Sequence, residues 1–113
     1  MKLIIAGGRK FDDYDLVCRE LEGYKPECVI SGTAIGADTL GIRWADMRGI
    51  PIVRMPAQWH KFGNEAGFIR NEEMAKVGTH LVAFWDGKSR GTKSMIWIAR
   101  QRELDVKVVR YEG

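Results

Sequence analysis

Cysteine, proline and long apolar runs are all scarce in this chain of 113 residues. Its two cysteines, Cys18 and Cys28, form neither a CxxC nor a His–Cys spacing, which argues against a disulfide framework or a thiolate metal site. No apolar run approaches the roughly 20 residues of a membrane-spanning helix, and the run after Met1 is too short for a signal peptide. We therefore expect a cytoplasmic protein with no membrane segment, metal or cofactor, in which both thiols are buried as small apolar side chains.

The chain also has only a small excess of positive over negative charge. Lys and Arg number 18 against 15 Asp and Glu, and a net charge of +3 is too small to indicate nucleic-acid binding by itself. The sequence contains no internal repeat, low-complexity tract or long block of like charge. Residues 1–113 are therefore expected to form one domain with a single core.

Five short apolar runs alternate with segments of helical character. The runs have the length of strands and cover residues 3–6, 28–30, 52–55, 81–85 and 106–109, and those at 3–6 and 81–85 are expected to be buried in the sheet. Helices are predicted between them, over residues 14–21, 37–47 and 67–76 and through residues 95–99. Residues 57–66 have no steady period and are predicted to form a loop long enough to carry function. This βαβαβαβαβ order predicts an α/β fold, a three-layer sandwich around a five-stranded parallel sheet.

Caps and aromatic residues refine the predicted helices. Asp12 or Asp13 is placed to cap the first helix. Trp44 and Met47 fall on the apolar face of the second helix, and Trp97 falls on the last. An aromatic side chain at helical spacing usually packs, so both tryptophans are expected in the core or in a subunit contact.

Glycines follow the first, second and fourth strands, at residues 7 and 8, 32 and 36, and 87 and 91. In a parallel sheet, ligands bind beyond the carboxyl ends of the strands, where a helix N-terminus attracts an anion. Cationic residues fall at the same predicted edge: Arg9, Lys10, Lys88, Arg90 and Lys93. The sequence therefore predicts a phosphate or polyphosphate site, and a plain βα turn without a ligand is the alternative at each corner.

Several polar and aromatic side chains are candidates for contacts with the rest of such a ligand. Arg70 is predicted to clamp a phosphate, and Asn71 is assigned to the site beside it, with a solvated helix turn as the alternative for both. Trp59 is placed either to stack on a base or to plug the core, and Trp85 to form a wall of the site. Asp38 is placed either to cap the second helix or to bond a ribose hydroxyl of the ligand. A direct contact with phosphate is not expected, because the carboxylate and the phosphate would repel each other.

Five motifs jointly carry a resemblance to a known family. They are GGR at residues 7–9, SGTAIGAD at 31–38, PAQW at 56–59, GFIRNEEM at 67–74 and FWDGKSRGT at 84–92. Together they resemble the YspA-like branch of the SLOG superfamily, a group of Rossmann-like domains that includes the DprA/Smf proteins and the lonely-guy phosphoribohydrolases. The resemblance implies the strand order 3-2-1-4-5 and a homo-oligomer.

The resemblance also implies which residues meet the ligand. The corners after the first two strands would supply Gly7, Gly8, Arg9, Ser31, Gly32, Gly36, Ala37 and Asp38. The corner after the fourth strand would hold phosphate through Ser89, Arg90, Gly91 and Thr92, with Asp86 beside it.

One departure from the lonely-guy pattern bears on catalysis. Those enzymes carry PGGxGTxxE, whose Glu assists cleavage of the N-glycosidic bond, whereas this chain has DGKSRGTKSM with Met95 at that position. A thioether cannot exchange a proton, which leaves Asp38, Glu65, Glu72 or Asp86 as alternative carboxyl groups. The leading expectation is a domain that binds a nucleotide or nucleotide-derived signal, of the ADP-ribose or nucleoside phosphate type, as a sensor or sequestering protein. A nucleotide N-glycosidase and a single-stranded DNA binder are the alternatives.

Overall fold

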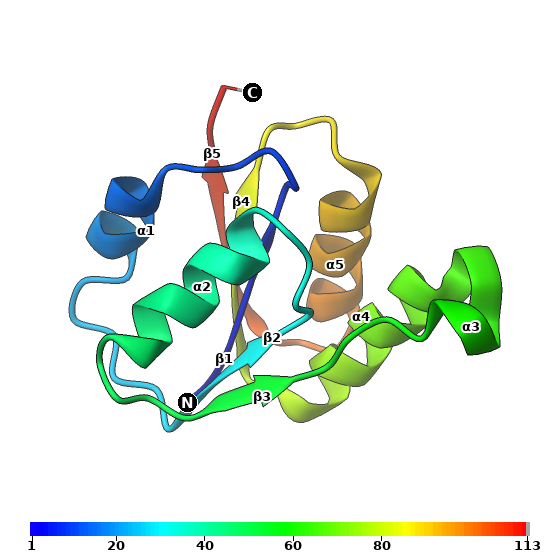
Figure 1. Cartoon of the computed structure of the whole chain (residues 1–113), viewed down its shortest axis with the longest axis horizontal. Coiled ribbons are helices and arrows are strands. Elements are labelled where there is room, and N and C mark those ends of the chain that lie inside the picture. Colours follow the sequence, from blue (N-terminus) through cyan, green and yellow to red (C-terminus); the bar gives the residue numbers. More distant parts are fainter. Residues whose placement is uncertain (113) are drawn as a thin grey trace.

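A computed structural model describes residues 1–112 as one five-stranded parallel sheet with helices on both faces (Figure 1). Along the chain the elements are β1 (Lys2–Gly7), α1 (Tyr14–Glu20), β2 (Cys28–Ser31), α2 (Ala37–Asp46), β3 (Ile52–Arg54), α3 (Trp59–Phe62), η1 (Gly63–Glu65), α4 (Ala66–Val77), β4 (His80–Trp85), α5 (Arg90–Gln101) and β5 (Asp105–Arg110). The strand order is β3-β2-β1-β4-β5. The predicted three-layer α/β sandwich and its strand order are confirmed.

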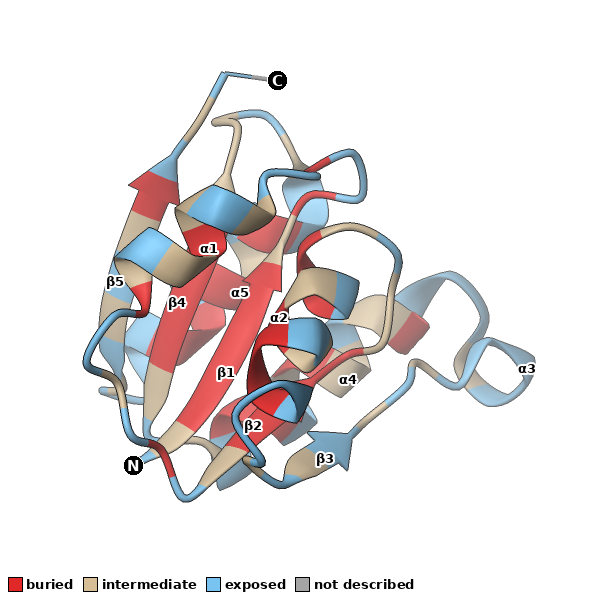
Figure 2. Ribbon diagram, turned by 60° about the vertical axis from the view of Figure 1, so that its left-hand side comes forward, coloured by how far each residue is buried: buried red, intermediate tan, exposed pale blue. Residues whose placement is uncertain are grey.

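The centre of the sheet is formed by β1 and β4, whose apolar runs are buried on both faces (Figure 2). They pair in parallel, with Ile5 opposite Val82 and Gly7 opposite Phe84. On its other side β1 pairs with β2, so that Leu3 lies opposite Val29. The carboxyl ends of β1, β2 and β4 therefore lie at one edge of the sheet.

The alternation of side chains along β1 builds two core clusters, one on each face of the sheet, in place of the single core expected from the sequence. Leu3 and Ile5 face α1 and α2 and pack in a cluster that includes Trp44. Ile4 and Ala6 face α4 and α5 and pack in a second cluster. Figure 1 shows these two helix pairs on opposite sides of the sheet. The site described below lies where both layers end at the carboxyl edge.

Two helices begin at side-chain caps that fix the direction of the preceding loops. The Asp13 carboxylate accepts a hydrogen bond from Leu16 N at 3.0 Å, so Asp13 rather than Asp12 caps α1. Ser89 caps α5, because its hydroxyl accepts from Thr92 N at 3.4 Å. Caps of this type satisfy N–H groups that have no partner within the helix.

The structure corrects the prediction of a loop over residues 57–66. This segment contains α3 and the 3-10 turn η1, and α4 begins at Ala66. Neither α3 nor η1 contains a buried residue, and α3 stands away from the sheet (Figures 1 and 2). A helix of 4 residues is too short to show an apolar period, which is why the sequence pattern did not reveal it.

Trp44 is buried as expected, but Met47 and Trp97 are not. Met47 is 69% exposed because it is the C-cap residue of α2, beyond the last helical turn. Trp97 is 62% exposed, since the buried stripe of α5 runs through Thr92, Met95 and Ile96 and leaves position 97 on the other face. The predicted core position of Met47 is therefore wrong. Trp97 does not lie in the core, and its alternative, a subunit contact, stays a prediction.

The two thiols are also less buried than predicted. Cys18 and Cys28 are free and half-buried, and each packs against the margin of one core cluster. None of the helices in the described part of the chain has the length and apolarity that crossing a bilayer requires.

Candidate functional site

A cavity of about 400 Å³ opens at the carboxyl edge of the sheet, and we name it the edge cavity. It lies where the loops after β1 and β4 meet the N-termini of α4 and α5. Its lining residues are Ala6, Gly7, Gly8, Arg9, Lys10, Ala34, Asp38, Trp59, Asn64, Gly67, Phe68, Arg70, Asn71, Met74, Asp86, Ser89, Gly91, Thr92, Met95 and Tyr111. The chain leaves β1 toward β2 on one side and returns at β4 on the other, so this is the topological switch point of the sheet, where parallel α/β folds bind ligands.

The corner after β1 is narrow because other backbone surrounds it. A side chain at Gly7 would overlap the carbonyl oxygen of Phe84 and the Cβ of Ala37. Gly8 donates its N–H to Phe84 O at 3.2 Å, and its own carbonyl accepts from Ala37 N at 3.2 Å. The corner therefore joins β4 to the start of α2 and leaves no room for a Cβ.

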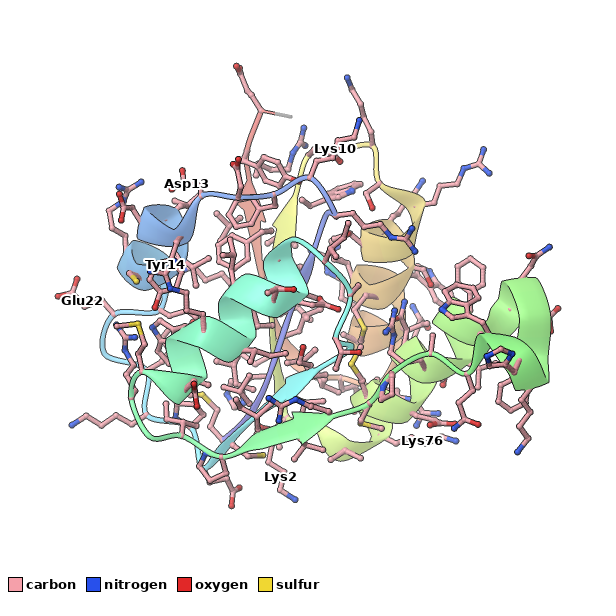
Figure 3. All side chains as sticks on the ribbon, viewed as in Figure 1. Lys2, Lys10, Asp13, Tyr14, Glu22 and Lys76 are labelled. Carbon is pink, nitrogen blue, oxygen red and sulfur yellow. The ribbon has the colours of Figure 1, made fainter. Side chains whose placement is uncertain are left out.

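Two cationic residues come directly after this corner and form part of the cavity wall. Arg9 and Lys10 are exposed and line the edge cavity. In Figure 3, Lys10 lies at the end of the molecule opposite Lys2, close to the loop between β4 and α5. Arg9 also contributes a positive potential at Arg70. An anion in the cavity would meet these charges at its mouth.

The hydrogen bonds of the corner after β2 are mainly internal to that corner. The Ser31 hydroxyl accepts from Thr33 N at 3.1 Å, and the Asp38 carboxylate accepts from Ala34 N at 3.1 Å. Gly36 precedes α2 with φ 87° and ψ −130°, a conformation that suits only glycine. Because Ala37 N already bonds Gly8 O, the start of α2 is partly occupied by the protein's own backbone.

Asp38 occupies the second position of α2, where it neither caps that helix nor reaches solvent. It is only 6% exposed, and Gly36 is the N-cap residue. Burial raises the pKa of its carboxyl from 3.8 to about 6, although the bond from Ala34 N and the charge of Arg70 lower it. The edge cavity thus contains a carboxyl group that exchanges its proton near neutral pH.

Arg70 ties the corner after β2 to α4. Its Nη1 donates to Gly32 O at 2.7 Å, and its Nε donates to Asn71 Oδ1 at 3.1 Å. Burial lowers the pKa of this guanidinium; Asp38 raises it and Arg9 lowers it further. Gly32 has no space for a Cβ, because the Arg70 guanidinium and Asp38 carboxylate lie against it.

Asn71 extends this bonding to the corner after β4. It is 5% exposed, and its Nδ2 donates to Gly91 O at 3.4 Å while its Oδ1 accepts from Arg70. Gly32, Arg70, Asn71 and Gly91 therefore form one hydrogen-bonded series that links the second and fourth strand corners. This series fixes the positions of the cavity walls.

The corner after β4 presents the N-terminus of α5 to the cavity. Asp86 Oδ1 accepts from Lys88 N and from Ser89 N, both at 2.8 Å. These bonds hold the pKa of the Asp86 carboxyl below its usual value. Ser89, Gly91 and Thr92 all line the cavity, and α5 is 12 residues long, so the positive end of its dipole faces the cavity.

Aromatic side chains form the other wall of the edge cavity. Trp59 and Phe68 line it, and each is 50% exposed. The Trp59 ring lies 3.6 Å from where a Cβ of Gly67 would be. Tyr111, which follows β5, closes the side beside Gly8, and burial and the charge of Asp86 raise the pKa of its phenol.

Most predicted site residues line the edge cavity, and the others lie behind or beside it. Those in the lining are Gly7, Gly8, Arg9, Asp38, Trp59, Arg70, Asn71, Asp86, Ser89, Gly91 and Thr92. Those outside the lining are Ser31, Gly32, Gly36, Ala37, Trp85 and Arg90. Gly32 and Gly36 support the lining through the contacts above, whereas Trp85 and Arg90 face a separate groove on α5.

Sequence reasoning did not assign Asn64, Phe68 or Tyr111 to the site, although all three line the edge cavity. Phe68 is part of the GFIRNEEM motif, but that motif drew attention only to Arg70 and Asn71. Tyr111 could have been found from the strand order, because β5 pairs with β4 and the residue after β5 must reach the same edge. Met95 lines the cavity although it is only 1% exposed, so the position compared with the lonely-guy Glu does face the cavity.

Two comparisons with known proteins found matches to this chain. The model of the YspA, cpYpsA-related SLOG family matches residues 1–62. The chain is also similar to the Gene 61 protein of Mycobacterium phage D29, with 32% identity over 116 residues that cover 93% of this chain and 93% of that protein. No solved structure matches. The family match contains the corners after β1 and β2, and the similarity to the phage protein extends over most of the chain.

Proposed function

This chain belongs to the YspA, cpYpsA-related SLOG family, and from that premise we propose that its edge cavity binds a nucleotide or nucleotide-derived signal. Membership of this family suggests a nucleotide-related function. The proposed ligand is of the ADP-ribose or nucleoside phosphate type, and its phosphate lies at the N-terminus of α5. In this proposal the protein acts as a sensor or sequestering protein without chemistry of its own.

The observation that carries this proposal is the combination of groups at the corner after β4. Ser89, Gly91 and Thr92 lie at the start of a helix of 12 residues and line the cavity. Apart from the adjoining residues and the helix's own backbone, no group of residues 1–112 lies within 4 Å of where a Cβ of Gly91 would be. Arg9 and Lys10 approach from the corner after β1. A helix N-terminus with free space and adjacent cations favours a phosphate over a neutral ligand.

The side of the cavity away from the α5 N-terminus suits a base and a ribose. Trp59 and Phe68 offer half-exposed aromatic faces, which bind a planar base by stacking. Asn64 adds an amide that can donate and accept hydrogen bonds. The Asp38 carboxyl repels phosphate when ionised and bonds a sugar hydroxyl in either protonation state. A cavity of about 400 Å³ lies within the range of small-molecule sites.

Isothermal titration calorimetry with AMP, ADP, ADP-ribose and a cyclic dinucleotide tests this function. We expect at least one to bind with a Kd below 1 mM at low salt, and the double variant Arg9→Ala/Lys10→Ala to weaken it about tenfold. Arg19→Ala, an exposed change on α1 outside the cavity lining, is the matched control and should leave the affinity unchanged. The proposal fails if no member of the panel binds better than millimolar.

A specific observation favours nucleotide N-glycosidase activity as the second candidate. Among the carboxyl groups considered as substitutes for the lonely-guy Glu, Glu72 is paired with Arg102 at 2.9 Å and Glu65 lies outside the lining. Asp38 and Asp86 line the cavity, and the pKa of Asp38 is about 6. A carboxyl group with a pKa near neutrality suits general acid–base catalysis, so Asp38 is the residue that would protonate a leaving base.

Chromatography distinguishes this candidate from simple binding. The protein is incubated with nucleoside monophosphates, and the solution is analysed for free base. Release of base that Asp38→Asn abolishes, with nucleotide affinity retained, would establish the hydrolase. Binding without any product supports the sensor or sequestering role.

A further inference from the structure

A second hollow, which we name the α5 groove, lies on the other side of the α5 N-terminus from the edge cavity. Its volume is about 470 Å³. Its lining residues are Trp85, Arg90, Lys93, Ser94, Ile96, Trp97, Arg100 and Gln101. Arg90 faces this groove, whereas its neighbours Ser89 and Gly91 line the edge cavity. The proposed function above does not use the groove.

The groove combines exposed aromatic surface with one sign of charge. Trp97 is 62% exposed, which is unusual for an indole on an amphipathic helix. Arg90, Lys93 and Arg100 are exposed, and none of the eight lining residues is acidic. Within residues 1–112 none of these three cations is paired with a carboxylate. The groove is thus left with unneutralised positive charge around an open indole face.

The spacing along α5 arranges these groups in a row. Positions 93, 97 and 100 are separated by four and three residues, so their side chains share one helix face with Trp97 between two cations. Arg90 extends the row by almost one turn toward the edge cavity. With a rise of 1.5 Å per residue, the row spans about 15 Å, which is enough for a few nucleotides of an extended strand.

We propose that the α5 groove binds single-stranded nucleic acid, with an unpaired base stacked on Trp97 and backbone phosphates on Arg90, Lys93 and Arg100. Positively charged grooves with exposed aromatic faces bind single strands in this way, because every base offers a face for stacking. The Arg110 guanidinium over the Trp85 ring, at 5.4 Å, adds a further cation beside the groove.

Charge argues against a second copy of this chain as the occupant. In a two-fold symmetric dimer the same patch lies on both sides of the interface, so the cations Arg90, Lys93 and Arg100 would lie against the same cationic cluster of the second copy. Like charges brought together in this way oppose association. A base-paired duplex also fits less well, since its bases are stacked internally and cannot cover the Trp97 ring.

Fluorescence anisotropy with labelled 12-nucleotide oligo(dT) and oligo(rU), at 50 to 300 mM salt, tests the proposal, and the two probes distinguish DNA from RNA. Three phosphate contacts give a slope of log K against log salt of about −2, and Lys93→Gln should reduce its magnitude by about 0.7. Trp97→Ala should weaken binding roughly fivefold to a hundredfold, and Trp97→Phe should retain part of the affinity. These side chains are exposed, so the melting temperature should stay unchanged.

Trp59→Ala serves as the matched aromatic control, because Trp59 is 50% exposed but lines the edge cavity. We expect it to leave oligonucleotide affinity near that of the unmodified protein, and Trp97→Ala to leave mononucleotide binding by calorimetry unchanged. Failure of the proposed nucleotide function would therefore be visible separately from failure of this groove.

Any one of four results overturns the proposal. The first is absence of oligonucleotide binding at 50 mM salt, and the second is binding that Trp97→Ala does not weaken. The third is a concentration-dependent dimer in sedimentation that Trp97→Ala dissociates, which would assign the groove to a second copy of the chain. Loss of oligonucleotide binding in Trp59→Ala alone would place the strand in the edge cavity and also overturn it.

Discussion

At the scale of single residues, the edge cavity is defined by groups whose surroundings differ strongly from water. Asp38 is buried beside the guanidinium of Arg70, yet within residues 1–112 the two form no ion pair within 4.0 Å. Burial is the largest influence on both, and it disfavours the charged form of each. The protein therefore holds a carboxyl group that becomes charged only near neutral pH.

Asp38→Asn should change how stability depends on pH. The folded-state pKa of Asp38 is about 6 and the reference value is 3.8, so between about pH 4 and pH 6 the folded protein keeps a proton that the unfolded chain releases. Stability of the parent protein falls across this window as pH rises and then levels off. Asp38→Asn lacks that loss and should be more stable at pH 7 by up to about 3 kcal/mol, with no difference below pH 4.

Urea denaturation at several pH values measures this difference. Asp86→Asn is the opposite control, because backbone N–H bonds lower the pKa of Asp86. The stability that Asp86 contributes is present at neutral pH and is lost as pH falls through its folded pKa, so this variant should be less stable at pH 7. Parallel pH profiles for Asp38→Asn and the parent protein would contradict the assignment of a raised pKa.

Gly36→Ala should destabilise the protein by more than a backbone penalty alone. Gly36 has φ 87°, and a Cβ there would overlap the carbonyl oxygens of Gly8 and Arg9. The conformation φ 87°, ψ −130° alone costs an alanine about 1 to 3 kcal/mol, and displacement of two backbone segments should bring the total to about 3 kcal/mol or more. Guanidinium denaturation measures the change.

The matched control for this substitution is Gly23→Ala. Gly23 has φ 83°, but a Cβ would meet no atom within 4 Å, so only the backbone penalty of about 1 kcal/mol applies. Equal losses of unfolding free energy in the two variants would mean that the packing of the β2 corner against the β1 corner contributes nothing to stability.

At the scale of secondary-structure elements, α5 lies between the edge cavity and the α5 groove. Its buried stripe fixes the helix on the sheet, its first turn faces the edge cavity, and its exposed face carries Trp97 and the α5 groove. The sequence indicated a helix here and left two places open for Trp97, the core or a subunit contact, of which the structure excludes the core. When a helix carries apolar residues on both faces, their periodicity does not show which of two adjacent residues, one aromatic and one aliphatic, faces the sheet.

Gly91→Ala should separate binding from stability at the start of α5. Space at Gly91 is open, and alanine favours a helix more than glycine does, so stability should be equal or higher by up to about 1 kcal/mol. The added methyl group occupies part of the space proposed for phosphate, so nucleotide affinity should fall about tenfold. Calorimetry and a thermal melt of the same sample provide both values.

Ser94→Ala is the control on the same helix, because Ser94 lines the α5 groove and not the edge cavity. Its nucleotide affinity should equal that of the parent protein. An unchanged affinity in Gly91→Ala would instead remove the N-terminus of α5 from the proposed phosphate site.

At the scale of the whole molecule, the sheet order brings residues that are far apart in the chain to one edge. The apolar runs and glycine corners predicted five strands and their carboxyl ends, and the family resemblance implied the order that the structure confirms. The sequence could not predict the series from Gly32 through Arg70 and Asn71 to Gly91, because those hydrogen bonds depend on the exact approach of α4. It also could not predict that Ala37 N is already bonded to Gly8 O.

Binding at this edge should stabilise the entire domain, because the cavity is formed only when β1, β4, α4 and α5 are assembled. A ligand at a free concentration of 100 times its Kd raises the free energy of unfolding by about 2.7 kcal/mol. For a domain of this size, that increase raises the melting temperature by about 10 °C. If Arg9→Ala/Lys10→Ala weakens Kd tenfold, the same concentration adds only about 1.4 kcal/mol and roughly half the shift. Arg19→Ala should show the full shift. Equal shifts in all three proteins would mean that the ligand binds away from the cations of the β1 corner, and the phosphate would then have to be placed elsewhere in the molecule.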